Sequence, residues 1–254
     1  MKIDGSVFIV TGGASGLGAQ VARSIISEGG LISILDVNSN LAIKLADELG
    51  KNKCYFHGPT DVTIESEVEL AIQRTMLYFN NATIRGTILC SGIVKPPKSL
   101  KGYAGNLTSF AQFEHIIKIN LLGTYCVAQK VAEKLLENKP INEDGEKGII
   151  ITVSSILGLD GLLVGYGTSK AGIAGLTLPL AKELAPFGIR VMCIAPGVFD
   201  TPLVNQSSES EGTPLSLFPH RLGNPIEFSN LVLQIIKMPM LNGSIIRLDG
   251  ALTV

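Results

Sequence analysis

The sequence contains no tryptophan, and aromatic residues make up only 6% of its 254 residues. Charged residues are also sparse at 17%, whereas about a quarter is usual for a soluble domain. Disordered chains combine many charges with low hydrophobicity, so this composition excludes a largely disordered chain. The net charge of −1 gives no overall field that would attract DNA or RNA, and it therefore indicates no nucleic-acid partner.

Long hydrophobic runs are absent as well, although 46% of the residues are hydrophobic and the mean hydropathy is +0.35. No run approaches the ~18 apolar residues that a membrane-spanning helix needs, so we expect no membrane partner. A soluble protein this apolar fits a parallel β-sheet that is covered on both faces. The strands of such a sheet are buried on both sides and appear as unbroken apolar runs.

Cysteine is the third scarce residue, with four copies at Cys54, Cys90, Cys126 and Cys193. They lie far apart and form neither a CxxC motif nor a Cys/His pattern with zinc-ligand spacing. The spacing therefore predicts no metal site and no disulfide framework. Reduced thiols in an intracellular compartment are the expected state.

Strand and helix patterns alternate along the whole chain. Apolar runs predict seven strands, at Val7–Val10, Leu31–Leu35, Cys54–Phe56, Ile84–Cys90, Ile149–Val153, Arg190–Ala195 and Ser244–Leu248. Helical periodicity separates them at Leu17–Glu28, Leu41–Leu49, Glu65–Phe79, Ser109–Glu137, Tyr166–Leu184 and Ile226–Ile236, and a polar loop spans Ile93–Leu107. The alternation predicts an α/β fold: one Rossmann-like domain over residues 1–254, with a doubly wound, seven-stranded parallel sheet between helices. Ligands of such sheets bind at the carboxyl ends of the strands.

A glycine-rich turn follows the first predicted strand and reads Thr11-Gly12-Gly13-Ala14-Ser15-Gly16-Leu17-Gly18. Glycines let a backbone turn tightly and approach a pyrophosphate, and the next helix offers free N–H groups to that anion. The turn therefore predicts a dinucleotide site that includes Gly12, Ser15, Gly16, Leu17 and Gly18. The alternative is an ordinary glycine-rich connection.

Acidic residues follow the second and third predicted strands. Asp36 stands where a carboxylate can accept both ribose hydroxyls and repel a 2′-phosphate, which favours NAD over NADP. Asp61 and Val62 follow the third strand, where an adenine amino group needs an acceptor. The alternatives are a surface aspartate at Asp36 and a helix N-cap at Asp61.

Tyr166 and Lys170 are four residues apart at the start of a predicted helix, so their side chains share one face. An unperturbed tyrosine pKa near ~10 is too high for acid–base catalysis at neutral pH, but a neighbouring ammonium lowers it. The same lysine can hold a ribose hydroxyl. Ser155 follows the fifth predicted strand and can hydrogen-bond a substrate oxygen. The Tyr/Lys spacing occurs often by chance, so these residues predict a site only in combination.

Together these motifs resemble the short-chain dehydrogenase/reductase family along essentially the whole chain. The resemblance rests on the glycine-rich turn, Asp36, Asp61-Val62, Asn120 within INLLGT, Ser154-Ser155, Tyr166 with Lys170, and Pro196-Gly197. It implies hydride transfer between a nicotinamide and a carbonyl or alcohol carbon. It implies that Tyr166 is the general acid/base, Lys170 lowers the pKa of Tyr166 and binds ribose, and Ser155 positions the substrate oxygen. Asn120 would hold a helix kink and a proton-relay water.

The second half of the chain resembles the branch of this family that acts on 3-hydroxyacyl-CoA thioesters and hydroxysteroids. The resemblance rests on residues 188–203, 221–225 and 241–251, and on the long loop from Ile93 to Leu107. It implies that Phe199 and Thr201 contact the nicotinamide half of NAD and that Cys90 and Gly92 contact its ribose. It also implies a homotetramer in mitochondria, with a cytoplasmic protein as the alternative. The loop lysines Lys95, Lys98 and Lys101 suit the phosphates of coenzyme A, or they form a solvated basic loop.

Three segments depart from the family pattern. Tyr166 follows Ser155 after eleven residues, about two fewer than usual, so the segment between them must take a tighter path; Ser154 is the alternative hydroxyl. Leu89 stands where the family has an asparagine that braces the sheet. The segment Gln206–Pro214, rich in Ser and Glu, is either a lid or a surface loop.

Three hypotheses follow. The first is an NAD-dependent enzyme that interconverts 3-hydroxyacyl-CoA and 3-ketoacyl-CoA, with hydroxysteroids as further candidate substrates. The second is a divergent NAD-binding fold that serves as a subunit or scaffold with little turnover, as the shortened Ser155–Tyr166 segment and Leu89 suggest. The third keeps the chemistry but changes the substrate to another alcohol or ketone.

Overall fold

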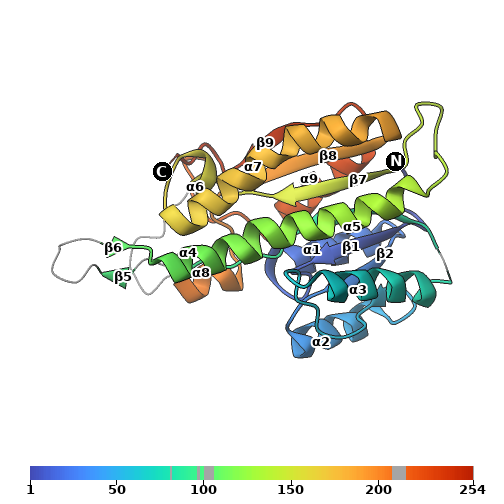
Figure 1. Cartoon of the computed structure of the whole chain (residues 1–254), viewed down its shortest axis with the longest axis horizontal. Coiled ribbons are helices and arrows are strands. Elements are labelled where there is room, and N and C mark those ends of the chain that lie inside the picture. The colour runs from blue at the N-terminus through green and yellow to red at the C-terminus, as the bar shows by residue number, and fades with distance from the viewer. Residues whose placement is uncertain (81, 96–97, 100–105, 208–215, 254) are drawn as a thin grey trace.

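The central element is a seven-stranded parallel sheet (Figure 1), in a computed structural model that describes residues 1–80, 82–95, 98–99, 106–207 and 216–253. The strands are β1 (Val7–Thr11), β2 (Leu31–Leu35), β3 (Cys54–Tyr55), β4 (Ile84–Leu89), β7 (Gly148–Val153), β8 (Ile189–Pro196) and β9 (Ile245–Leu248). Their spatial order is β3-β2-β1-β4-β7-β8-β9, and every neighbouring pair is parallel. The predicted α/β fold and its seven strands are confirmed.

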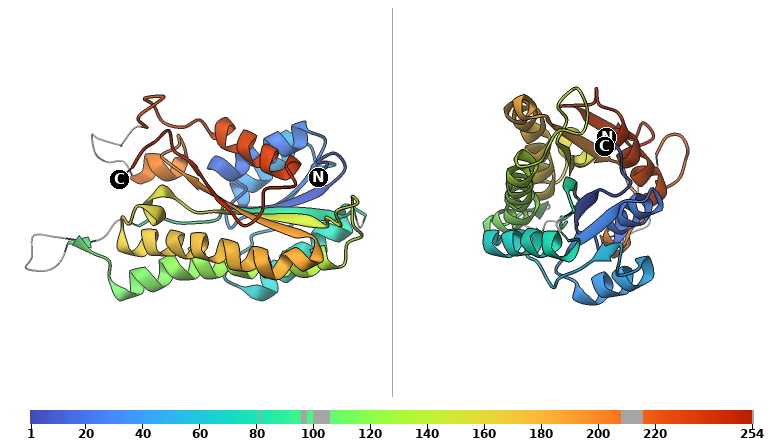
Figure 2. Two further views of the ribbon diagram at one scale, coloured as in Figure 1. Left: turned by 90° about the horizontal axis from the view of Figure 1, so that it is seen from above. Right: turned by 90° about the vertical axis from the view of Figure 1, so that its right-hand side faces the viewer.

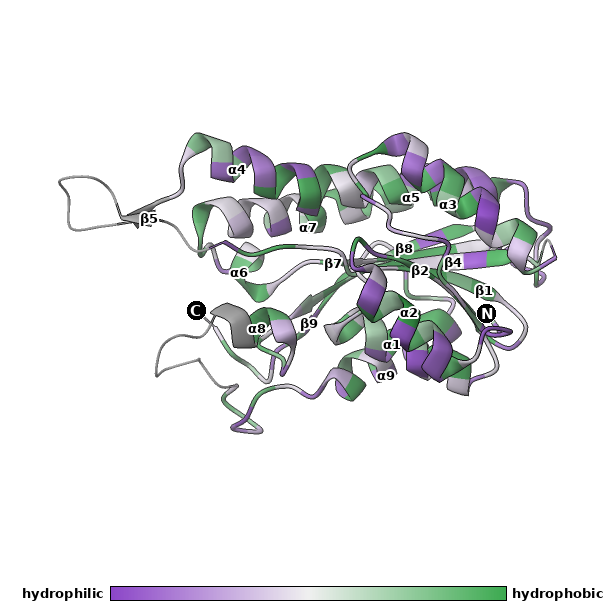
Figure 3. Ribbon diagram, turned by 90° about the horizontal axis from the view of Figure 1, so that it is seen from below, coloured by the Kyte–Doolittle hydropathy of each residue, from purple (hydrophilic) through white to green (hydrophobic). Residues whose placement is uncertain are grey.

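Helices cover both faces of the sheet (Figures 2 and 3). One layer contains α1 (Gly16–Ser27), α2 (Ser39–Leu49) and α9 (Pro225–Lys237), and the other contains α3 (Glu65–Tyr78), α4 (Phe110–Ile117), α5 (Thr124–Leu136) and α7 (Val164–Leu184). Each layer forms its own hydrophobic core against the sheet. Burial on both faces explains why strands such as β7 and β8 consist of fully buried residues.

The helix predicted at Ser109–Glu137 is interrupted. A π-helical segment at Lys118–Gly123 separates α4 from α5. Such single-turn widenings occur mostly at functional sites, and this one contains Asn120. The widened turn lies where the family resemblance implies a kink.

Several short elements were not expected from the sequence. A small antiparallel pair, β5 (Lys98–Ser99) and β6 (Asn106–Leu107), lies within the predicted polar loop. A one-turn helix, α6 (Ile156–Leu159), follows Ser155, a 3-10 turn covers Ala185–Phe187, and α8 covers Pro202–Ser207. None of the described helices is both long enough and apolar enough to cross a membrane.

The strand order positions the site. β1 lies between β2 and β4, and the chain moves outward in opposite directions from this point. In doubly wound sheets the loops diverge at such a switch point and leave a crevice at the carboxyl ends of the strands. The glycine-rich turn after β1 and the turn after β4 meet there.

Candidate active site

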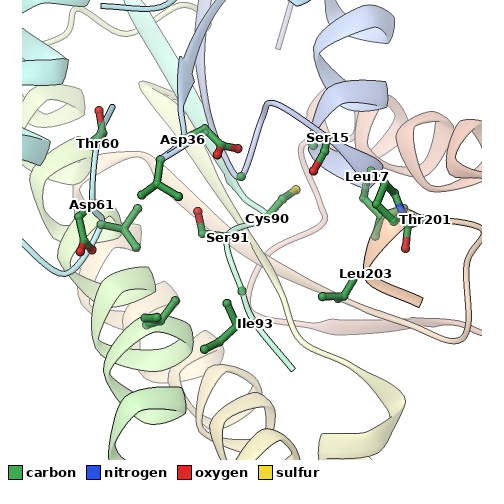
Figure 4. Close-up of a pocket in the computed structure, with 18 residues that line it drawn as sticks. Ser15, Leu17, Asp36, Thr60, Asp61, Cys90, Ser91, Ile93, Thr201 and Leu203 are labelled. Atoms are coloured by element: carbon green, nitrogen blue, oxygen red, sulfur yellow. The ribbon is translucent and has the colours of Figure 1, made fainter. Parts of the chain in front are cut away.

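A cavity of about 500 Å³ opens at the carboxyl ends of β1, β2 and β4 (Figure 4). It is lined by Gly12, Ser15, Gly16, Leu17, Gly18, Asp36, Val37, Thr60, Asp61, Val62, Cys90, Ser91, Gly92, Ile93, Ile119, Thr201, Pro202 and Leu203. Asp36, Thr60 and Asp61 lie toward one end of the cavity, and Ser15, Leu17 and Thr201 lie toward the other. The cavity therefore runs from the acidic loops to the glycine-rich turn and α8.

Close backbone packing explains the glycines of the turn. Gly12 has a positive φ of 60°, and a Cβ there would lie 2.9 Å from the carbonyl carbon and oxygen of Cys90. A Cβ on Gly18 would collide with the carbonyl oxygen of Gly12. Ser15 is the N-cap of α1 and makes no side-chain capping hydrogen bond. Gly16, Leu17 and Gly18, the first residues of α1, line the cavity, and N–H groups at a helix start are the donors that a pyrophosphate requires.

The Asp36 carboxylate is fixed at the end of β2. Its Oδ2 atom accepts a hydrogen bond from the Ala14 N–H at 3.0 Å, and its Oδ1 atom accepts one from the Asn38 N–H at 2.9 Å. The group therefore ties the glycine-rich turn to the β2 loop while it lines the cavity. A carboxylate has about four lone-pair directions, so it can also accept hydroxyl groups of a ligand.

Ser155 and Tyr166 lie side by side, although the segment between them is short. Their side chains are near enough for the Ser155 hydroxyl to influence the ionisation of Tyr166. Burial raises the pKa of Tyr166 to about 12, and the hydrogen bond from Ser155 opposes that rise. At neutral pH the phenol is therefore protonated and can donate a proton.

Lys170 lies one turn further along α7 and is 4% exposed. Its Nζ atom donates to the Val153 carbonyl at 2.8 Å and lies 5.7 Å from the centre of the Tyr166 ring. Burial lowers the pKa of Lys170 to about 8. Burial is the largest influence on the pKa of Tyr166 and Ser155 opposes it, and the role of Lys170 in lowering that pKa stays a prediction.

Asn120 is fully buried in the π-helical segment. Its Oδ1 atom accepts from the Ile93 N–H at 2.8 Å, and its Nδ2 group donates to the Ile93 carbonyl and to Ser169 Oγ, both at 3.0 Å. Ser169 Oγ in turn donates to the Tyr166 carbonyl at 2.6 Å. Asn120 therefore connects the loop after β4 to the first turns of α7.

The structure brings most of the predicted cofactor residues to the cavity wall. These are the five residues of the glycine-rich turn together with Asp36, Asp61, Val62, Cys90, Gly92 and Thr201. Lys170 borders the same wall, since a Cβ on Gly92 would lie 3.4 Å from Lys170 Nζ and 3.4 Å from Asn120 Oδ1. Cys90 is close enough to Lys170 to interact with its charge, and burial raises the pKa of the Cys90 thiol to about 12.

Two predicted residues lie elsewhere. Phe199 is not among the residues that line this cavity; its side chain is 5% exposed and packs edge-on against Phe228, with ring centres 6.3 Å apart, and its contact with the nicotinamide stays a prediction. Ser154 is not an alternative partner for Tyr166, because its hydroxyl is buried and donates to the Lys170 carbonyl at 2.7 Å. Leu89, the replacement for the expected asparagine, is buried in the core against the α5 side of the sheet.

Several lining residues were missed by sequence reasoning: Val37, Thr60, Ser91, Ile93, Ile119, Pro202 and Leu203. Each of them is within two residues of a predicted site residue, so closeness in sequence to those residues could have identified them. Lys101 and most of the segment Gln206–Pro214 lie outside the described residues. Among the residues that the structure describes, no three His, Cys, Asp or Glu side chains gather to hold a metal ion.

Comparison with known proteins gives a consistent result. The family profile for short chain dehydrogenases matches residues 6–212. The chain is 38% identical over 256 residues to the 3-hydroxyacyl-CoA dehydrogenase type-2 of Homo sapiens, covering 99% of this chain and 96% of that protein. It is 38% identical over 258 residues to ipsdienol dehydrogenase of Ips pini, covering 99% and 98%. The crystal structure of 3-hydroxyacyl-CoA dehydrogenase type-2 from Mycobacterium avium matches with a TM-score of 0.88 at 33% identity, over 98% of this chain and 96% of that one.

The chain belongs to the short-chain dehydrogenase family. This membership confirms the predicted class of enzyme, an NAD-dependent oxidoreductase.

Proposed function

We propose that this enzyme interconverts 3-hydroxyacyl-CoA and 3-ketoacyl-CoA thioesters, with hydroxysteroids as further candidate substrates. The observation that carries the proposal is the placement of Ser155 close to Tyr166 and of Lys170 beside the Tyr166 ring, next to a cavity that fits a dinucleotide. The substrate class is supported by the printed names of the human and mycobacterial relatives. We also propose that residues 1–254 act as one short-chain dehydrogenase domain.

The residues at the cavity fit NAD. The N–H groups at the start of α1 would hold the pyrophosphate, Asp36 the adenine ribose, and Asp61 with Val62 the adenine ring. Cys90 and Gly92 line the cavity next to Lys170. Together with Thr201 at the end near α8, they would contact the nicotinamide half. NAD supplies the hydride acceptor in oxidation and, as NADH, the hydride donor in reduction.

The chain itself handles the proton and the substrate oxygen. In the reduction of a ketone, the protonated Tyr166 phenol donates its proton to the carbonyl oxygen while the Ser155 hydroxyl holds that oxygen in place. In oxidation, the Tyr166 phenolate must accept the hydroxyl proton, and both Ser155 and the nearby Lys170 ammonium favour that charged form. Asn120 holds the loop after β4 next to α7 through its hydrogen bonds to Ile93 and Ser169. The relay water that the family resemblance assigns to Asn120 stays a prediction.

The test is an assay of the purified protein with NADH and acetoacetyl-CoA, monitored by loss of NADH absorbance. The proposal predicts turnover with NADH and much slower turnover with NADPH, because the Asp36 carboxylate repels a 2′-phosphate. Tight NADH binding without turnover on any carbonyl substrate would instead support the cofactor-binding scaffold.

A second candidate substrate class is another small alcohol or ketone. The observation that favours it is the equal identity, 38%, of this chain to ipsdienol dehydrogenase and to the human acyl-CoA enzyme. A panel of thioesters, terpenoid alcohols and steroids at matched concentrations separates the two. The higher kcat/KM identifies the substrate class.

We further propose a homotetramer that resides in mitochondria, with the cytoplasm as the alternative, as the family resemblance implies. Exposed apolar side chains on the outer helical layer support an association: Phe110 is 80% exposed, and Leu122, Tyr125 and Leu178 are each at least 45% exposed. Light scattering of the purified protein tests the tetramer, and fractionation of cells that express the full-length protein tests the compartment.

A further inference from the structure

The position of Ser155 depends on the one-turn helix α6. Ser155 is the N-cap of α6, and its hydroxyl accepts a hydrogen bond from the Leu157 N–H at 3.2 Å. Asp160 is the C-cap of the same helix. A shift of α6 would therefore move the Ser155 hydroxyl relative to Tyr166.

The inner side of α6 is fixed against α7 by backbone contact. A Cβ on Gly158 would lie 2.6 Å from the Ala171 nitrogen, and a Cβ on Gly167 would lie 2.9 Å from the Leu157 carbonyl oxygen.

The segment that links α6 to Tyr166 is short and sharply bent, since Gly161 and Leu163 have positive φ values of 84° and 58°. Leucine rarely adopts this conformation, so the surrounding structure must impose it.

The outer side of α6 is held by one arginine from the last strand of the sheet. Arg247 in β9 donates two hydrogen bonds to the Asp160 carboxylate, at 2.6 Å and 2.9 Å. The same guanidinium donates to Asp249 Oδ2 at 2.6 Å and to the Leu252 carbonyl at 2.9 Å. The Asp160 side chain is only 15% exposed. A bidentate pair of this kind fixes orientation as well as distance.

We propose that Asp160 and Arg247 are positioning residues for the reaction, and that their ion pair holds α6 where Ser155 meets Tyr166. The inference rests on the proposed roles of Ser155 and Tyr166. The ion pair explains how a segment about two residues shorter than usual still brings the two hydroxyls together. Arg247 in β9, which also contacts Asp249 and Leu252, holds this segment in place through Asp160. The last strand thereby contributes to a site whose other residues come from earlier in the chain.

The consequence is a measurable change at Tyr166. Without the ion pair, α6 is free to move away from α7, and the hydrogen bond from Ser155 weakens. The charged and titratable groups near Tyr166 are Lys170 on its own helix and, beside Lys170, the thiols of Cys90 and Cys193. None of these belongs to α6, so they stay in place. Since the Ser155 hydrogen bond lowers the pKa of Tyr166, its loss raises the pH at which Tyr166 ionises.

The experiment compares Asp160→Asn and Arg247→Met with the wild-type protein. The matched control is Arg23→Met, because Arg23 forms a bidentate pair with Glu48, at 2.8 Å and 2.9 Å, away from the site. Measured quantities are kcat, the KM values, and the ionisation of Tyr166. The last comes from the ultraviolet absorbance of tyrosinate, as the difference between each protein and its Tyr166→Phe counterpart.

We expect kcat to fall by about tenfold to a hundredfold in both variants, as a ~1 Å misplacement of a catalytic group implies. The KM for NADH should stay within about twofold, since the pair does not touch the cavity. Tyr166 should ionise at higher pH in both variants, and the control should match the wild type. The double variant Asp160→Arg with Arg247→Asp should recover part of the lost kcat.

An unchanged kcat, or a lower kcat with Tyr166 ionising at the wild-type pH, would overturn the inference, because a merely structural pair would leave that ionisation where it is. If Arg247→Met does not fold, Asp160→Asn decides, since it retains the size of the side chain. If the wild-type protein shows no turnover, the proposed function fails, while the Tyr166 titration still decides the positioning role.

Discussion

Asp36 is the residue on which cofactor choice depends. Two backbone N–H groups fix its carboxylate at the cavity wall, so it cannot swing away from a 2′-phosphate. We predict that Asp36→Asn, which keeps the size but removes the charge, raises the ratio of kcat/KM for NADPH to that for NADH by at least about tenfold, or about 1.4 kcal/mol. Steady-state kinetics with both cofactors provide the measurement, and an unchanged ratio would contradict the role of the charge.

Lys170 gives a pH signature in the unliganded protein. Its pKa is lowered from 10.5 to about 8 by burial, so between these values the unfolded chain binds more protons than the folded one, and stability rises with pH. The cleanest window is pH 8 to 9, below the ordinary thiol pKa of 9.0. There the free energy of unfolding of the wild type should rise by about 1 kcal/mol relative to Lys170→Met. Denaturant titrations at both pH values test this, and a flat or falling difference would refute it.

At the scale of elements, α6 packs closely against the backbone of α7. We predict that Gly158→Ala lowers both stability, by about 1–3 kcal/mol, and turnover, because the added Cβ meets the backbone at Lys170 and Ala171. The matched control is Gly175→Ala in the neighbouring helix α7, where a Cβ would meet no atom within 4 Å. That change should stabilise the protein by up to about 1 kcal/mol through helix propensity. Thermal unfolding and activity of both variants show whether the close approach is the cause.

At the scale of the whole molecule, the end of the sheet opposite the cavity is closed by a buried ion pair. Arg190 Nη2 lies 2.8 Å from Glu146 Oε1, and both side chains are at most 7% exposed. Arg190 also donates to the carbonyls of Ile235 and Ile236 at the end of α9. The pair therefore ties β8 to the helix that packs across the sheet.

We predict that Glu146→Gln reduces the free energy of unfolding by about 3–5 kcal/mol, because it leaves a buried guanidinium without its counter-charge. The exposed control Glu48→Gln should lose at most about 1 kcal/mol. Turnover per folded molecule should be unchanged in both, since the pair lies at the amino ends of β7 and β8. A loss of less than 1 kcal/mol in Glu146→Gln, measured in denaturant, would show that the pair does not stabilise the fold.

The parts of this molecule that were predictable from sequence are those encoded locally. The glycine-rich turn, Asp36 and the Tyr166–Lys170 spacing each lie within a few residues of a strand end or helix start, and parallel strands place their ends at one edge. The same reasoning gave seven strands, because burial on both faces leaves unbroken apolar runs. Substrate class and assembly came from the family resemblance.

The remainder depends on contacts between distant segments. The approach of Ser155 to Tyr166 depends on α6, which the sequence pattern did not reveal because one helical turn carries no periodicity. The contact of the Phe199 ring with Phe228, on α9, likewise joins distant segments and follows no sequence pattern. The pair of Asp160 with Arg247 joins residues 87 positions apart, and neither residue belongs to a recognisable motif.

The measurement that tests the account most directly is a comparison of wild-type protein with Tyr166→Phe, by NADH-coupled reduction of acetoacetyl-CoA and, separately, by NADH fluorescence titration. The substitution removes only the hydroxyl that donates the proton. We predict that turnover falls by at least about a hundredfold, the usual scale of a lost general acid, while the Kd for NADH changes by less than about threefold. Turnover retained in Tyr166→Phe would contradict the assignment of Tyr166 as the acid/base and, with it, the mechanism built around the Ser155–Tyr166 pair.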